Sequence, residues 1–235
     1  MNSIFKFNSF FVLLCLFSVF CFAKTKDRIS PPHELVRSTT ESLIRLIEKG
    51  KGVNKNGLYY RKPQQFFQEL ESLIDPLVDF NSFTRVVMGQ YGTKKYYQSL
   101  DKEQKTQFKK DYKAFVKEFK KGLINTYGKG LMVFNGKKVI VEPVKSSDWQ
   151  LIDNNKMVDV VQKIEDKGKV HKVIFKMRPD KKGNWLFRNM IIDNINLGEL
   201  YQNQFKAAMS KYKGNFNLVV QNWMTDMASA KDSLQ

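Results

Sequence analysis

The spacing of apolar residues predicts helices at both ends of the chain. Apolar side chains recur every three or four positions from Val36 to Ile47, from Phe66 to Leu77 and, over about five turns, from Phe108 to Tyr127. The same period returns from Leu197 to Tyr212 and from Phe216 to Met227. Since this spacing places the apolar side chains on one face of a helix, each stretch is typical of a helix that packs against a core.

Local signals predict where some of these helices begin and end. Asp101 and Gln104 have the spacing of a capping box, which predicts the start of the longest helix. We expect Gly128 and Gly130 to end that helix, because glycine is common just after a helix. Residues 50–62 are polar and basic, and we expect them to form a loop.

Between residues 139 and 191 the period changes from about 3.6 to two, which predicts strands. Turn sequences at residues 166–168 and 180–183 separate the apolar runs, and this order indicates an antiparallel meander. The residues that we place on one face of the sheet are Val139, Val141, Val158, Val160, Ile164, Val173, Phe175, Met177, Trp185, Phe187 and Ile191. We therefore predict an α+β fold in which a curved antiparallel sheet of four to five strands packs against a helical layer.

The N-terminus has the features of a secretory signal peptide. Lys6 is the only charged residue before Lys24, and an apolar run of about 14 residues ends at Ala23. A membrane-spanning helix usually needs ~20 apolar residues. We expect cleavage after Ala23, which divides the chain into a signal peptide (1–23), a short tail (24–31), one domain (32–230) and a C-terminal tail (231–235).

The positions of the cysteines and the net charge are consistent with an exported protein. The full chain of 235 residues has a formal charge of +17, and both cysteines lie in the predicted signal peptide. The processed chain would have no disulfide, and export argues against a nucleic-acid partner. Many lysines lie opposite the apolar face of the longest helix. Two interpretations stay open, a solubilising surface or attraction to an acidic partner or a lipid surface.

The sequence contains no motif that indicates catalysis or a metal site. His33 and His171 are the only histidines and lie far apart, and no G-x-S-x-G motif is present. We interpret His33 as a solvated residue of a first helical turn and His171 as a residue of the sheet. We therefore expect neither an enzyme nor a bound cofactor.

Large apolar side chains are the most prominent feature that remains. The chain has 19 Phe, 9 Tyr, 3 Trp and 9 Met, and ligand pockets are mostly apolar. A curved sheet with helices on one side can enclose a cavity. The residues that we predict to line it are Phe83, Val87, Met88, Tyr91, Tyr97, Phe115, Phe119, Val158, Val160, Val173, Phe175, Met177, Trp185, Phe187, Ile195 and Leu200.

Several segments together resemble one known family. They are Val78-Asp79-Phe80 followed by Met88-Gly89-Gln90-Tyr91, the helix that starts near Asp101, Gly183-Asn184-Trp185, and Leu197 with Tyr201 and Phe205. In order and spacing these segments are similar to the MlaC family of periplasmic phospholipid-binding proteins, over roughly residues 32–227. The family's fold is a cone related to NTF2-like proteins.

The resemblance implies a monomeric periplasmic shuttle with phospholipid as its cargo. Members of the family carry lipid between an outer-membrane lipoprotein–porin complex and an inner-membrane ABC transporter with a ring of MCE domains. This transport maintains the lipid asymmetry of the outer membrane. The lipid tails lie in a cavity between the sheet and the helices, and the head group faces water.

This chain departs from the family's pattern at several positions. Asn189 stands where the family usually has Asp, residues 194–196 replace a G-x-S motif, and Gln202 follows Tyr201 in place of Arg. Residues 92–95 resemble an insertion. Two other functions remain open from the residues alone: an exported enzyme on a similar cone-shaped fold with His171 or a buried carboxylate as its base, and a lipid-free adaptor.

Overall fold

The structure is a computed structural model that describes residues 31–133, 138–166 and 168–232. The predicted signal peptide therefore lies outside the described residues. The helices are α1 (Pro32–Lys51), α2 (Leu58–Arg61), α3 (Pro63–Ile74), α4 (Phe80–Val87), α5 (Lys94–Ser99), α6 (Lys102–Val133), α7 (Ser146–Asp153), α8 (Leu197–Lys211) and α9 (Phe216–Asp232). Short 3₁₀ turns occur at Val53–Lys55, Asp75–Leu77 and Gly89–Gly92.

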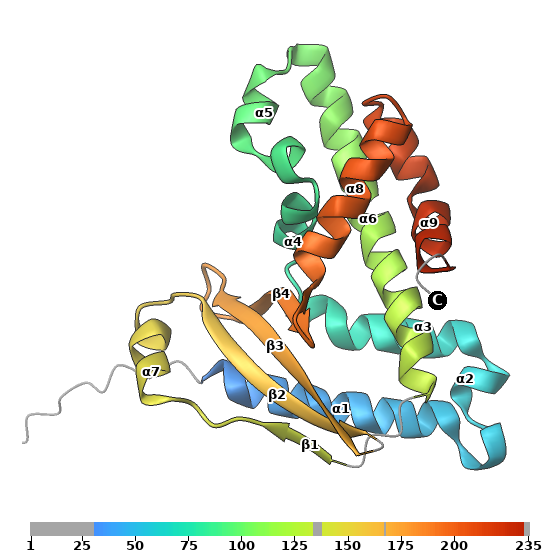
Figure 1. Cartoon of the computed structure of the whole chain (residues 1–235), viewed down its shortest axis with the longest axis vertical. Helices are drawn as coiled ribbons and strands as arrows, with labels where there is room; N and C mark the ends of the chain where they lie inside the picture. Colours follow the sequence, from blue (N-terminus) through green and yellow to red (C-terminus); the bar gives the residue numbers. More distant parts are fainter. Residues whose placement is uncertain (1–30, 134–137, 167, 233–235) are drawn as a thin grey trace, which may run out of the picture.

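The strands form one antiparallel sheet in the order β1-β2-β3-β4-β5. They are β1 (Lys138–Val141), β2 (Val158–Asp166), β3 (Lys169–Pro179), β4 (Trp185–Ile192) and β5 (Ile195–Asn196). In Figure 1, α1 lies beside the sheet, while α6 runs from the sheet toward the opposite end of the molecule with α8 and α9 next to it. The predicted α+β class and the antiparallel sheet are confirmed.

A β-bulge in β4 changes which side chains face the helices. Met177 of β3 pairs with Phe187, but Lys176 pairs with Asn189, so Arg188 is an extra residue in β4. A bulge of this kind sets two residues against one on the partner strand, and the alternation of faces is inverted beyond it.

Because of the bulge, one residue that alternation places on the inner face of the sheet lies on the outer face. Phe187 faces the helices as predicted, but after the bulge this face passes to Met190 and Ile192, which pair with inward-facing residues of β3. Ile191 faces the other side of the sheet, so the prediction that it shares the face of Phe187 is wrong. Alternation by two fails here because the extra residue leaves no mark in the pattern of apolar residues.

The longest helix begins as predicted but ends later. Asp101 N donates to Gln104 Oε1 at 3.0 Å, and Gln104 N donates to Asp101 Oδ1 at 2.7 Å, which confirms the capping box. The helix continues past Gly128 to Val133. A Cβ atom on Gly128 would lie 2.6 Å from the ring of Phe67 in α3. This glycine therefore permits a close crossing of two helices instead of ending one.

The segment 50–62 is also more ordered than a loop. It contains a 3₁₀ turn and α2, and Leu58 of α2 is buried against α1 and α3. The expectation of a polar loop is therefore wrong for its second half. Four residues give too short a pattern for a helical period to be visible in the sequence.

The apolar core is divided into three clusters. The first joins α4, α6, α8 and α9 around Phe115 and Trp223, and the second joins α1, α2, α3 and α6 around Phe66. The third lies between α1, α7 and the sheet around Val158. A domain of this size usually has one contiguous core. Here an apolar space remains between the three clusters.

Candidate functional site

An apolar cavity of about 350 Å³ lies where the three core clusters meet. Its wall combines residues of all three, such as Phe83 of α4, Leu70 of α3 and Phe175 of β3. The surface of this wall is almost entirely carbon. The volume is within the range of ~300–1,000 Å³ that is common for ligand pockets.

Helix α1 forms one side of the cavity. Its lining residues are spaced by three or four positions, which places them on a single face: Val36, Thr39, Thr40, Leu43, Ile44 and Ile47. The helix begins at Pro32, whose fixed φ suits a first helical turn, and its last turn is closed by Gly52 N donating to Glu48 O. A straight amphipathic helix of this length can cover one side of an elongated ligand.

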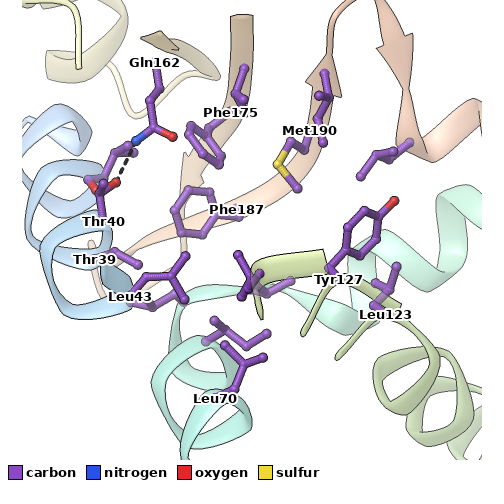
Figure 2. Close-up of a pocket in the computed structure, with 18 of the residues that line it drawn as sticks. Thr39, Thr40, Leu43, Leu70, Leu123, Tyr127, Gln162, Phe175, Phe187 and Met190 are labelled. Carbon is purple, nitrogen blue, oxygen red and sulfur yellow. Dashed lines mark hydrogen bonds between the residues drawn. The ribbon is translucent and has the colours of Figure 1, made fainter. Parts of the chain in front are cut away.

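The sheet forms the opposite side, and its polar lining residues are Gln162 and Asn189. Gln162 of β2 is buried, and its Nε2 donates to Thr40 Oγ1 at 2.6 Å (Figure 2). Thr40 Oγ1 in turn donates to the carbonyl oxygen of Val36 at 2.7 Å. Because these groups satisfy one another, the polar atoms are held at the seam between α1 and β2 and the cavity keeps an apolar surface.

Helix α6 closes the third side with Leu123, Ile124, Tyr127, Gly128 and Leu131. The hydroxyl group of Tyr201 in α8 donates to the hydroxyl oxygen of Tyr127 at 3.3 Å. Burial raises the pKa of both phenols above the usual value, so they stay neutral at physiological pH. These phenols therefore contribute hydrogen bonding between α6 and α8 and no charge near the cavity.

The cavity brings together only some of the predicted lining residues. Phe83, Val173, Phe175 and Phe187 lie in its wall. The rings of Phe175 and Phe187 have centroids 5.1 Å apart, and both face the lumen in Figure 2. The alternation of apolar residues before the bulge correctly predicted that these two side chains lie on the same face of the sheet.

The other predicted lining residues lie elsewhere. Val87, Met88, Phe115 and Phe119 are buried in the first core cluster, with Tyr91 and Leu200 packed against it. Val158, Val160, Met177 and Trp185 belong to the third cluster, where α1 and α7 cover them. Tyr97 lies on α5 against Phe108, and Ile195 is 56% exposed on β5. Contact of these residues with a ligand stays a prediction.

Sequence reasoning missed the α1 face, the end of α3 and the second half of α6. The α6 segment carries a signal that could have been used. From Gly122 to Gly128 the helix contains no charged residue, whereas lysines are frequent before it. A helical stretch without charged side chains is typical of a segment that packs against several neighbours, and this segment crosses α1 and α3 beside the cavity with Leu123, Ile124 and Gly128 buried.

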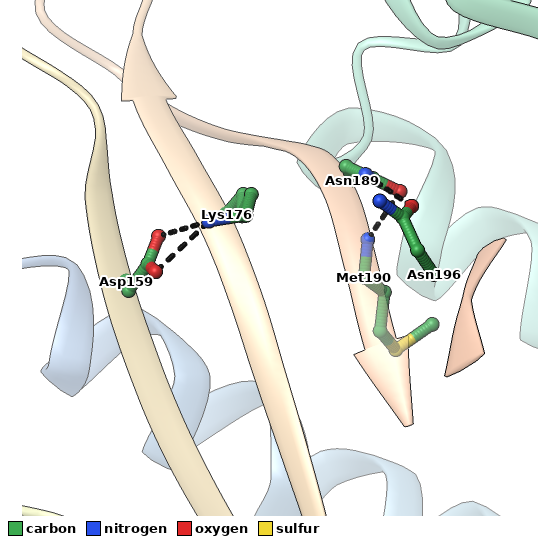
Figure 3. A network of polar contacts seen from close by, with 5 residues as sticks. All are labelled: Asp159, Lys176, Asn189, Met190 and Asn196. Atoms are coloured by element: carbon green, nitrogen blue, oxygen red, sulfur yellow. Dashed lines mark hydrogen bonds and ion pairs between the residues drawn. The ribbon is translucent and has the colours of Figure 1, made fainter. Parts of the chain in front are cut away.

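The positions that depart from the family pattern serve as structural links. Asn189 Nδ2 donates to Asn196 Oδ1 at 2.8 Å (Figure 3). Asn189 Oδ1 accepts from the backbone N of Gly198 at 3.0 Å. Asn196 caps α8, so the pair fixes the angle at which α8 leaves the sheet. Gln202 Nε2 donates to Val86 O at 2.8 Å and joins α8 to α4. Thr93, in the apparent insertion, caps α5.

The two histidines lie away from the cavity wall. His171 Nδ1 is 2.5 Å from Asp193 Oδ2, and this hydrogen bond is the main cause that lowers the pKa of Asp193. His33 is buried, which corrects the expectation of a solvated residue, and burial lowers its pKa although Asp148 opposes this. Among the described residues, no group of three His, Cys, Asp or Glu side chains is placed to hold a metal ion.

Comparison with known proteins gives one consistent result. The family described as MlaC protein matches residues 38–225 of the chain. The toluene tolerance protein ttg2D of Pseudomonas putida is 27% identical over 203 residues, which is 86% of this chain and 84% of that protein.

A solved structure has the same fold. It is the phospholipid-binding protein from Ralstonia solanacearum in complex with a phospholipid, with a TM-score of 0.60 and 22% sequence identity. The alignment covers 85% of this chain and 98% of that one. The family match extends over most of the chain and includes every residue that lines the cavity except Val36. This chain therefore belongs to the MlaC family.

Proposed function

We propose that this protein is a periplasmic carrier that holds the acyl chains of a phospholipid in the cavity between α1, α3, α6 and the sheet. The observation that supports the proposal most directly is the cavity itself, whose wall is almost entirely carbon. Such a wall offers nothing to a polar substrate, because a polar group placed there would lose its hydrogen bonds to water. An acyl chain has no such groups.

The energetics explain why a carrier is needed. A diacyl phospholipid has on the order of 28 methylene groups, and each costs ~0.8 kcal/mol to move into water. Unassisted exit from a bilayer therefore costs roughly 20 kcal/mol. A protein that encloses the tails removes most of this cost without covalent chemistry. The phospholipid is thus cargo, and the proposal requires no cofactor and no catalytic residue.

The proposal includes the place and the partners of the carrier. After cleavage near Ala23, the domain 32–230 would act as a monomer in the periplasm, and residues 24–31 and 231–235 would be tails. It would exchange lipid with an outer-membrane lipoprotein–porin complex and with an inner-membrane ABC transporter that has an MCE-domain ring, and so maintain outer-membrane lipid asymmetry. Nucleic acid is not among the proposed partners. These statements rest on membership of the MlaC family.

The two other functions have less support in the geometry. An enzyme would need reactive groups at the cavity, but His171 is paired with Asp193 at the end of the sheet and is not among the lining residues. A lipid-free adaptor would be expected to fill its own core, whereas here the space between the three clusters is open.

The first experiment is native mass spectrometry of the protein purified after export, followed by extraction of any bound lipid. We expect a mass that exceeds that of the processed chain by one or more phospholipids. A bare mass that stays bare after the protein is mixed with phospholipid vesicles would contradict the carrier function. The measured mass of the chain also locates the cleavage site.

A further inference from the structure

A row of lysines on α6 has no acidic partner among the residues that the structure describes. Lys105, Lys109, Lys113, Lys117 and Lys121, called the lysine row below, are spaced four residues apart and therefore form a continuous ridge of neighbouring side chains that winds slowly around the helix. All except Lys105 are exposed. Within the part of the chain that the structure describes, none of the five forms an ion pair with a carboxylate.

The stability of the fold does not explain the lysine row. Like charges four residues apart on a helix repel and are destabilising. The neighbouring Lys120 shows the opposite arrangement, because its Nζ lies 2.8 Å from Glu71 and 3.0 Å from Asp75 and thereby ties α6 to α3 and the turn after it. Asp111 is buried and bonded to Gln107 and Asn217, so it does not neutralise the row.

Tyrosines accompany the lysine row at its N-terminal end. In Figure 1, α5 and the first turns of α6 lie together at the end of the molecule that is far from the sheet. The ammonium groups of Lys105 and Lys109 lie 5.9 and 5.7 Å from the centre of the Tyr97 ring. Tyr96 is half-buried against Tyr91 and Phe108. Half-buried tyrosines beside lysines are typical of surfaces that meet the head-group region of a bilayer.

The choice of lysine over arginine distinguishes a lipid surface from a protein partner. The sequence contains no arginine between Arg85 and Arg178. Protein interfaces are enriched in arginine, whose guanidinium group binds carboxylates in a bidentate manner, and they are depleted in lysine. A lysine ammonium group is a flexible point charge, which suits attraction to many mobile anionic head groups.

We propose that the lysine row and the adjoining tyrosines of α5 bind the surface of an anionic phospholipid bilayer. This binding does not require lipid in the cavity and is separate from docking on protein partners. It would hold the carrier close to a membrane while it meets those partners. The attraction is electrostatic, so it weakens as salt screens the charges.

The test is binding of the protein purified after export to vesicles of pure phosphatidylcholine and to vesicles that contain 30% phosphatidylglycerol. The variant is Lys109→Gln/Lys113→Gln/Lys117→Gln. The matched control, Lys169→Gln/Lys181→Gln/Lys182→Gln, removes the same number of exposed lysines from the hairpin turns of the sheet. Each lysine near an anionic surface changes binding about five-fold. We therefore expect the row variant to bind anionic vesicles roughly 100-fold less tightly and the control to change little.

Several results of the vesicle assay would overturn the proposal. They are absence of binding to anionic vesicles at 50 mM salt, binding that is equally strong at 500 mM salt, and equal losses in the row variant and the control. If the row variant fails to support the outer-membrane barrier in cells although its vesicle binding is unchanged, the row serves an acidic protein and the proposal is wrong.

Further measurements separate this proposal from the carrier function. A thermal melt establishes that the row variant is folded, and the single variant Lys113→Gln, with an expected loss of about five-fold, replaces it if it is not. Native mass spectrometry reports the lipid content of both variants. Loss of vesicle binding with unchanged lipid content supports the proposal, whereas loss of lipid from the row variant alone would contradict it.

Discussion

Replacement of Phe175 by Glu tests whether acyl chains occupy the cavity. Phe175 lies in the cavity wall on β3. An ionised carboxylate is strongly disfavoured next to an acyl chain, so the carboxyl group must take up a proton before lipid can bind. The ordinary pKa of Glu is about 4.3, and protonation at pH 7 therefore costs about 3.7 kcal/mol. We expect lipid affinity at pH 7 to fall by roughly 500-fold or more.

The same reasoning predicts recovery in acid. At pH 5 the cost of protonation is only about 1 kcal/mol, so the affinity of Phe175→Glu for lipid should rise about 100-fold between pH 7 and pH 5. A purely steric or structural defect would not follow the titration of one carboxyl group. The direction of the pH dependence is therefore the most informative part of the experiment.

The assay is equilibrium partitioning of a labelled phospholipid between vesicles and the protein, measured at several pH values after the two are separated. Vesicles are the right competitor, because a bilayer and an apolar cavity are similar environments for an acyl chain. A difference of a few kcal/mol in the free energy of the lipid therefore decides whether the cavity is occupied. Val170→Glu is the matched control, since Val170 is on the same strand, is 60% exposed and faces the opposite side of the sheet. A Phe175→Glu protein that is folded and carries lipid normally at pH 7 would refute the assignment of the cavity.

Three further predictions concern stability. Gly128→Ala should lower the free energy of unfolding by about 1–2 kcal/mol in urea titrations. The added Cβ meets the ring of Phe67, and this strain exceeds the gain in helix propensity. An unchanged or higher free energy of unfolding would contradict the close crossing of α3 and α6. Asn196→Ala should lower it by about 1 kcal/mol through loss of the α8 cap, and wild-type stability of this variant would show that Asn189 suffices. Burial lowers the pKa of His33, so the buried imidazole is favoured in its neutral form. The stability that this neutral imidazole contributes is present above pH 6.5 and is lost as the pH falls below that value. The unfolding free energy should therefore fall more between pH 7.5 and 5.5 in the wild-type protein than in His33→Gln, and equal slopes in chemical denaturation would contradict this.

The type and order of the elements were predictable because they depend on local periodicity. The helices around Val36–Ile47 and Phe108–Tyr127, the meander and the capping box at Asp101 all occur where the sequence indicates them. The inward side of the strands was also correct up to the bulge. The lysine row is visible in the sequence as well, because charge on an exposed helix face needs no tertiary contact to be recognised.

The cavity itself was decided only by the tertiary structure. A core residue and a cavity residue have the same apolar character, so Phe115 and Phe175 cannot be distinguished by pattern, although one is packed among α6, α8 and α9 and the other faces open space. The difference arises from how far α1, α3 and α6 stand from the sheet. That distance depends on the Gly128 crossing, on the bulge at Arg188 and on the Asn189–Asn196 link. The Gly128 crossing joins helices that are distant in sequence, the bulge shifts a register, and the Asn189–Asn196 link is a single pair of polar residues. None of the three leaves a periodic signal in the chain.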